Sequence, residues 1–189
     1  MATGRSTTGR IYTLRIEIEE IEPLIWRRLH VAASITLPRL HSVLQVVMGW
    51  TDSHLHSFEI GDREYSNAEE LDEVNMLDEK GRKLESLLGG TIREFGYQYD
   101  FGDSWEHRIF VESIAAPKAD WLYPLCVSGE RACPPEDVGG SGGYQDFLDT
   151  IAKPDHEEHE SMLVWIGGAF DPEGFDINSV NRELRRLRL

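Results

Sequence analysis

The sequence predicts a single compact α+β domain in which a mainly antiparallel sheet packs against several helices. Residues 11–19 and 24–31 alternate between polar and apolar side chains and are separated only by a short acidic turn with Pro23, as in a hairpin. Apolar residues then recur at helical spacing, most of them in the last third of the chain. Because strands and helices do not alternate regularly, a doubly wound parallel sheet is not expected.

The strands are expected near residues 11–19, 24–31, 54–60, 93–101 and 104–114, where polar and apolar residues alternate. Helices are expected near 38–48, 144–152, 156–166 and 177–187. Thr36 is a plausible N-cap of the first helix, and Asp155 with Glu158 resembles a capping box before the third. Residues 115–143, rich in proline and glycine, are expected to be irregular. Large buried side chains should include Trp26, Trp105 and Trp165.

The most informative stretch is 97–107, where four aromatic residues, three acidic residues and a histidine surround a glycine turn. A three-residue loop at 101–103 would pair Tyr99 with Trp105 and Tyr97 with His107, which keeps the aromatic side chains on one face. Gly102 or Asp103 would then take the positive φ of the turn. The opposite, polar face would carry Asp100, Glu106 and Arg108.

The net charge of −15 lies entirely in residues 61–189, because residues 1–60 are neutral. An acidic surface repels phosphate groups, so direct binding of nucleic acid is not expected, nor binding to an anionic membrane. A cationic ligand, a divalent metal or a basic protein partner remains possible. The acidic stretch 62–79 is expected to be a solvated loop with a short helix.

The chain contains no run of the ~20 apolar residues that a membrane helix requires. Residues 1–10 are polar and lack an apolar signal-peptide core, so we expect a disordered leader, a single domain over 11–189 and a cytoplasmic protein. Cys126 and Cys133 are then expected to be reduced, and their spacing is looser than that of a zinc half-site.

Two sets of residues form the candidate site. A ligand surface is expected from the hairpin, the strand at 54–58 and the loop at 133–143, with 134–143 packed over the hairpin tip. Its ligand-binding residues would be Trp50, Tyr97, Tyr99, Asp100, Trp105, Glu136 and Asp137. A divalent metal, if bound, would be held by His54, His56 and His107 with one carboxylate, Asp103 or alternatively Asp100 or Asp52. Histidines two apart on a strand share one face, so His54 and His56 could reach a common ion. The histidines could instead be packing partners in the core.

The chain from about Ile11 onward resembles the plasmid pRiA4b Orf-three-like family, which is also catalogued as a transposon-passenger family with a resolvase name. The matching stretches are LIWRR at 24–28, GW at 49–50, HLHSF at 54–58, YQYDFGDSWEH at 97–107, ACPPEDVGG at 132–140, WIGG at 165–168, FDPE at 170–173 and Asn181. The resemblance implies a compact α+β domain from bacterial and mobile-element contexts. The residues do not support the resolvase name, since Ser6 lies in the polar leader and the chain is acidic.

Two functional hypotheses follow. The first is a non-catalytic domain that binds a ligand or a protein, and no cofactor is predicted for it. The alternative is a metal-dependent hydrolase that uses the His/Asp cluster. Nucleophilic catalysis is disfavoured, because nothing in the sequence lowers the pKa of Cys133 and no nucleophile-elbow motif surrounds Ser104.

Overall fold

The computed structural model describes residues 9–67 and 76–187, and it shows the predicted α+β fold. In this part of the chain one eight-stranded sheet has the order β5-β4-β3-β6-β7-β1-β2-β8. All neighbouring strands are antiparallel except β4 and β5. The strands are β1 (Ile11–Ile18), β2 (Trp26–Ala32), β3 (His56–Ile60), β4 (Arg63–Ser66), β5 (Leu77–Asp78), β6 (Glu94–Tyr99), β7 (Trp105–Ala115) and β8 (Leu125–Glu130). The helices are α1 (Leu37–Met48), α2 (Leu84–Leu88), α3 (Gly140–Ile151), α4 (His159–Trp165) and α5 (Ile177–Leu184).

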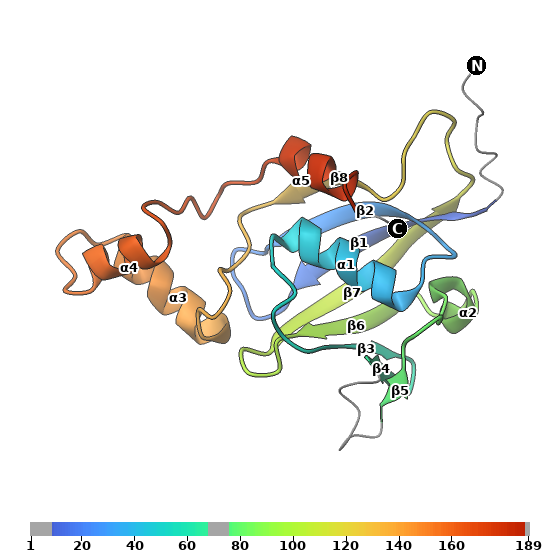
Figure 1. Ribbon diagram of the computed structural model, residues 1–189, viewed down its shortest axis with the longest axis horizontal. Helices are drawn as coiled ribbons and strands as arrows, with labels where there is room; N and C mark the ends of the chain where they lie inside the picture. The colour runs from blue at the N-terminus through green and yellow to red at the C-terminus, as the bar shows by residue number, and fades with distance from the viewer. Residues whose placement is uncertain (1–8, 68–75, 188–189) are drawn as a thin grey trace.

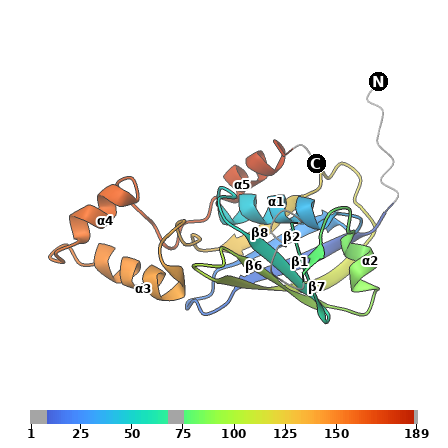
Figure 2. The same cartoon turned by 60° about the horizontal axis from the view of Figure 1, so that its bottom comes forward.

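The core lies between the sheet and α1, which crosses one face of the sheet (Figures 1 and 2). Alternate residues of β1 point to this side, so Leu14 and Ile16 are completely buried. The facing residues of α1 recur at helical spacing and include Leu40, Val43 and Leu44, also completely buried. Burial of this apolar surface is the main stabilising term of such a layered domain.

The predicted register of the hairpin is confirmed, because Tyr99 pairs with Trp105 and Tyr97 with His107. The details of the turn differ from the prediction. Asp100 and Ser104, each with φ of 56°, adopt the left-handed conformation in place of Gly102 or Asp103. The Asp100 side chain folds back into the turn and accepts hydrogen bonds from the backbone N–H groups of Gly102 (3.0 Å) and Asp103 (3.3 Å). Asp100 is therefore buried instead of lying on the polar face.

Several predicted elements are placed differently. Strand β8 lies inside the segment predicted to be irregular, because it pairs with β2 over a long sequence separation. Helix α3 begins at Gly140, and α4 begins after Glu158, which takes the N-cap position without a side-chain cap, so the capping box with Asp155 is not formed. The strand predicted at 54–60 starts at His56.

Burial of the tryptophans also differs from the prediction. Trp105 is buried, but Trp26 is half-buried on the outer face of the sheet and Trp165 is 47% exposed. Trp165 lies on α4, and α3 and α4 project beyond the sheet as an arm with little other structure to cover them (Figure 1). The acidic stretch forms β4 and β5 where it is described. The short helix predicted within 62–79 does not form in the described part of that stretch, and residues 68–75 lie outside the described residues. Residues 1–8 of the leader predicted at 1–10 also lie outside them.

The guanidinium group of Arg27 is buried in the core, a role that no pattern in the sequence indicated. It donates hydrogen bonds to four backbone carbonyl oxygens at 2.7–3.0 Å, those of Trp26, Val47, Glu130 and Arg131. Arg27 thus joins the end of α1 to the segment that follows β8. That segment carries Cys133, a free thiol like Cys126, and leads directly into the candidate site.

No helix in residues 9–67 and 76–187 is long and apolar enough to cross a membrane.

Candidate functional site

Three loops meet at one end of the sheet: the loop after α1, the β6–β7 hairpin tip and the segment between β8 and α3. The indole N–H of Trp50 donates to the carbonyl oxygen of Pro134 at 3.0 Å, which joins the first loop to the third. The backbone N–H of Gly139 donates to Asp103 Oδ2 at 3.0 Å, which joins the third loop to the hairpin. These contacts confirm that the 134–143 segment packs over the hairpin tip.

The aromatic residues predicted to bind a ligand form the floor beneath these loops. Trp50 stacks on Tyr99 with ring centroids 4.9 Å apart and lies 6.2 Å from Trp105, while His107 contacts it edge-on at 5.4 Å. Tyr97 packs against His107 on the same face. All five side chains are buried, so the rings support the site and do not offer an open surface to a ligand.

Above this floor, one histidine faces three carboxylates. His54 Nε2 lies 2.9 Å from Asp137 Oδ1, 3.5 Å from Asp100 Oδ2 and 3.5 Å from Glu136 Oε2. None of these contacts has the alignment of a hydrogen bond, and His54 Nε2 is a buried nitrogen without a hydrogen-bond partner among the described residues. The ring nitrogen and the carboxylate oxygens therefore converge on a common point.

The neighbouring backbone holds two of the carboxylates in place. Because Asp100 uses Oδ1 to accept the turn N–H groups, its Oδ2 is left to face His54. Glu136 Oε1 accepts hydrogen bonds from the backbone N–H of Thr51 at 2.6 Å and from the Tyr99 hydroxyl at 3.1 Å. Burial raises the pKa of Tyr99, so this hydroxyl stays protonated and acts as a donor. The carboxylates are thus oriented before any ligand arrives.

The backbone at the site is in a costly conformation. Asp52, Asp100 and Asp137 have φ of 58°, 56° and 59°, the left-handed region that non-glycine residues rarely occupy. Each lies on a different one of the three loops. Aspartate tolerates this conformation better than most residues, because its short side chain bonds to nearby backbone groups. Left-handed non-glycine residues often occur at functional sites.

His54, Asp100 and Asp137 form a set of possible metal ligands, whose ligand atoms all lie within 4.8 Å of one another. Of the residues predicted to hold a metal, the structure places His54 in this set together with Asp100, one of the alternative carboxylates. His54 precedes β3 while His56 is its first residue, so the two histidines do not share a strand face. Asp100 and Asp137 were predicted as ligand-binding residues and lie at its centre.

Three other predicted metal ligands have different partners. His56 Nε2 is 3.2 Å from Glu79 Oε2, and the His56 ring contacts Phe58 and Tyr97. Asp103 accepts the Gly139 N–H, and His107 donates from Nδ1 to the backbone oxygen of Trp105 at 2.9 Å.

His41, which the sequence analysis did not single out, supports the site from below. Its ring stacks on His56 with centroids 3.5 Å apart, and its Nδ1 is 2.8 Å from the Tyr97 hydroxyl. That hydroxyl accepts a hydrogen bond from Gln45, so it donates its own proton to His41 Nδ1. Nε2 of His41 then carries the proton and donates to Asp52 Oδ1 at 2.7 Å. Burial, with the neighbouring His56, lowers the pKa of His41 and favours this neutral form.

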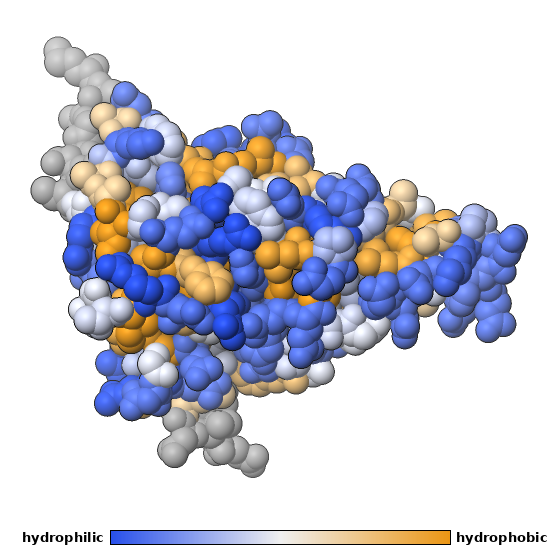
Figure 3. Space-filling view, turned by 180° about the vertical axis from the view of Figure 1, so that it is seen from behind, coloured by the Kyte–Doolittle hydropathy of each residue, from blue (hydrophilic) through white to orange (hydrophobic). Residues whose placement is uncertain are grey.

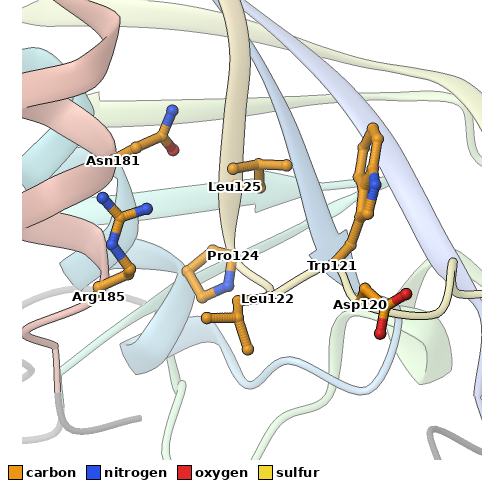
Figure 4. Close-up of a pocket in the computed structure, with 7 residues that line it drawn as sticks. All are labelled: Asp120, Trp121, Leu122, Pro124, Leu125, Asn181 and Arg185. Carbon is orange, nitrogen blue, oxygen red and sulfur yellow. The ribbon is translucent and has the colours of Figure 1, made fainter.

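A separate pocket of about 230 Å³ lies between β8, α5 and the loop before β8 (Figure 4). Its lining residues are Asp120, Trp121, Leu122, Pro124, Leu125, Asn181 and Arg185. None of them belongs to the predicted site. The amide of Asn181 is engaged by the backbone of Cys126, so this pocket brings together no comparable set of ligand atoms.

The fold and the site together define an α+β domain with a His–carboxylate cluster at the tip of a hairpin. The chain belongs to the family described as "Plasmid pRiA4b ORF-3-like protein", whose model matches residues 10–179. This confirms the resemblance that was drawn from the sequence motifs.

Two relatives extend the comparison. The "Uncharacterized protein y4hQ" of Sinorhizobium fredii (strain NBRC 101917 / NGR234) is 37% identical over 179 residues, which are 94% of this chain and 92% of that protein. The crystal structure of a "Protein of Unknown Function MM3350" from Methanosarcina mazei Go1 has a TM-score of 0.83 and 37% identity. The match covers 90% of this chain and 97% of the other. Neither name states an activity, so function has to be argued from the site.

Proposed function

We propose that this protein is a non-catalytic binding domain whose ligand is a divalent metal ion held by His54, Asp100 and Asp137. The observation that carries the proposal is the position of His54 Nε2, buried and without a hydrogen bond among the described residues, yet within 3.5 Å of three carboxylates. A neutral imidazole nitrogen offers a lone pair to a cation, and the carboxylate oxygens offer negative charge.

Electrostatics supports the same assignment. Asp100, Glu136 and Asp137 place three acidic groups around one nitrogen, and none of them forms an ion pair with Lys or Arg in residues 9–67 and 76–187. Like charges this close repel one another, and partial burial of Asp100 and Glu136 weakens the screening by water. A divalent cation would offset this repulsion, so the cluster is better matched to a cation than to a neutral ligand.

The ligand chemistry narrows the choice of metal. One imidazole nitrogen with two carboxylates suits zinc, manganese, iron or nickel, whereas calcium and magnesium prefer oxygen ligands alone. Glu136 is fixed by hydrogen bonds from Thr51 and Tyr99 and lies beside His54. It would help to orient His54, as residues next to the direct ligands do in metal sites. We therefore expect Zn²⁺ or Mn²⁺ to bind more tightly than Mg²⁺.

The experiment is a metal titration of protein purified without a histidine tag and stripped with a chelator. Isothermal titration calorimetry with Zn²⁺ and Mn²⁺, and the absorption bands of added Co²⁺, should show one site per chain. His54→Gln and Asp137→Asn each remove one ligand and should weaken binding at least tenfold, about 1.4 kcal/mol. Both side chains are at least partly exposed, so the fold should tolerate the changes.

The matched control is His156→Gln, which removes an exposed histidine of the arm and should leave the affinity unchanged. His56→Gln tests for a metal site elsewhere, because a loss of metal there with His54→Gln silent would refute the proposed ligands and place the metal at His56 and Glu79. No saturable binding by the wild-type protein, or equal binding by the His54 and His156 variants, would refute the proposal.

A metal-dependent hydrolase is the second candidate, and the exposure of Asp137 favours it. The Asp137 side chain is 70% exposed, so a metal bound there would border solvent and could keep a water molecule as a ligand. Such a bound water is the nucleophile of many metal hydrolases. Zn²⁺- or Mn²⁺-loaded protein should be assayed with p-nitrophenyl phosphate and p-nitrophenyl acetate. Turnover that is lost in His54→Gln would change the assignment from binding to hydrolysis.

A further inference from the structure

The arm formed by α3 and α4 is the least covered part of the described structure. It extends away from the sheet in both ribbon views (Figures 1 and 2). Among the described residues, the two helices contact each other, and neither has an extensive contact with another helix or strand. Helix α4 has no buried residue, and Val164 and Trp165 are 78% and 47% exposed. Large apolar side chains exposed together on one element often mark a site of interaction with another protein.

A groove of about 360 Å³ runs between the two helices. Phe147, Met162 and Trp165 form its apolar surface, and the Phe147 and Trp165 rings meet edge to face with centroids 5.7 Å apart. Asp146 and Glu158 line the same groove. This volume accommodates one or two large apolar side chains.

The charge of the arm is strongly negative. Between residues 140 and 165 there are six Asp or Glu residues and one lysine, Lys153, which pairs with Asp149. Asp146 and Glu158 form no ion pair in the described parts of the chain, although they border an apolar groove. Figure 3 shows the molecule from behind, and on the projecting arm hydrophobic residues (orange) are exposed among hydrophilic ones (blue).

We propose that the arm is a docking surface for a basic amphipathic segment of a partner protein. Leucine or aromatic side chains of that segment would enter the groove against Phe147 and Trp165, and its lysine or arginine residues would pair with Asp146 and Glu158. Opposite charges around an apolar centre give an interface both its affinity and its orientation. Asp137, one of the proposed metal ligands, also lines the groove, so the two sites adjoin. The contacts proposed for the partner segment involve Phe147, Trp165, Asp146 and Glu158 and do not require a bound metal.

The test uses a short fluorescein-labelled peptide of leucine and lysine at helical spacing, and fluorescence anisotropy with the full chain. Trp165→Ala removes apolar contact from the groove and should weaken binding by about tenfold, because tryptophans are common interface hot spots. Val164→Ser removes the exposed apolar side chain next to Trp165 in the sequence and should weaken binding less. Asp146→Asn with Glu158→Gln should weaken it at least fivefold. A leucine–glutamate peptide of the same spacing should not bind.

The matched control is Glu22→Gln with Asp62→Asn, which removes the same charge from exposed positions outside the groove and should change affinity less than twofold. Equal losses from the two charge pairs would show attraction to any acidic surface and overturn the proposal. So would absence of binding by the wild-type protein, or unchanged binding by both Val164→Ser and Trp165→Ala. Val164 is so exposed that its serine variant keeps the arm folded even if Trp165→Ala does not. Metal titration of the same variants separates this outcome from a failure of the metal site.

Discussion

The side chain of Asn181 pairs with the backbone of Cys126 as a neighbouring strand would. Its Oδ1 accepts the Cys126 N–H at 2.9 Å, and its Nδ2 donates to the Cys126 carbonyl oxygen at 2.8 Å. Cys126 lies on β8, the last strand of the sheet order, whose outer edge has no strand beside it in the described structure. Unpaired edges invite association with other chains, so Asn181 both satisfies this edge and anchors α5 to it.

Loss of this pairing should be costly. Asn181→Ala leaves a buried donor and acceptor on Cys126 unsatisfied, and we expect the free energy of unfolding to fall by about 1–3 kcal/mol. Asn178→Ala, on an exposed position of the same helix, is the matched control and should cost no more than about 0.5 kcal/mol. Urea denaturation followed by circular dichroism measures both. Equal stability of the two variants would show that the Asn181 amide contributes nothing.

The start of α3 depends on the absence of a side chain at Gly143. A Cβ added there would lie 2.1 Å from the carbonyl oxygen of Val138, whereas one at Gly142 would meet nothing within 4 Å. We expect Gly143→Ala to destabilise the protein by about 1–3 kcal/mol through overpacking. Gly142→Ala should instead stabilise it, by up to about 1 kcal/mol, because alanine is the better helix former.

The same pair of variants also probes the site. Val138 follows Asp137 directly, so a shift forced at Val138 should move Asp137 away from His54 and weaken metal binding in Gly143→Ala alone. Thermal melting and a Co²⁺ titration of both alanine variants measure the two effects. A Gly143→Ala protein as stable as Gly142→Ala would mean that the loop rearranges without cost.

Stability should decline in mild acid because of His107. Burial lowers its pKa to about 4, while the unfolded chain takes up this proton near pH 6.5. The unfolded state therefore binds more protons between these values. The contribution of His107 is complete above pH 6.5 and is lost as the pH falls toward 4, by about 3 kcal/mol.

Urea denaturation at several values between pH 7 and pH 4 measures this decline. His107→Asn keeps a donor for the Trp105 carbonyl oxygen and removes the titration, so its stability should vary less with pH than that of the wild type. His156→Asn, at an exposed position, should follow the wild-type curve. A His107→Asn protein with an unaltered pH dependence would assign the acid sensitivity to other groups, with His41 the next candidate because its pKa is also lowered.

Local patterns were enough to predict much of the architecture. The alternation of polar and apolar residues along β1 and β2 predicted their antiparallel pairing. A hairpin loop with an odd number of residues predicted the Tyr99–Trp105 register of β6 and β7, because a one-residue slip would move every side chain to the opposite face. The spacing from Leu40 to Met48 predicted α1. The motifs predicted the family, and the loop at 134–143 was correctly expected over the hairpin.

The arrangement of the cluster depends on contacts between distant parts of the chain. His54 and His56 look equivalent in the sequence, but β3 begins between them, so His54 turns toward Asp100 and Asp137 while His56 packs under His41. The position of Asp137 depends on Arg27 of β2 and on Trp50 after α1. Both donate hydrogen bonds to backbone carbonyl oxygens of the segment after β8 and so fix that segment in place. Likewise, β8 is a strand because β2 offers it hydrogen bonds.

Neighbouring residues and recognisable motifs were sufficient to predict the α+β class, the strand pairing near the N-terminus, the hairpin register and the family. Three-dimensional packing was needed to show which histidine meets which carboxylates, how far Trp165 is exposed and how Arg27 is buried. Side-chain convergence of this kind depends on packing between segments that are far apart in sequence, and local periodicity carries no information about that packing.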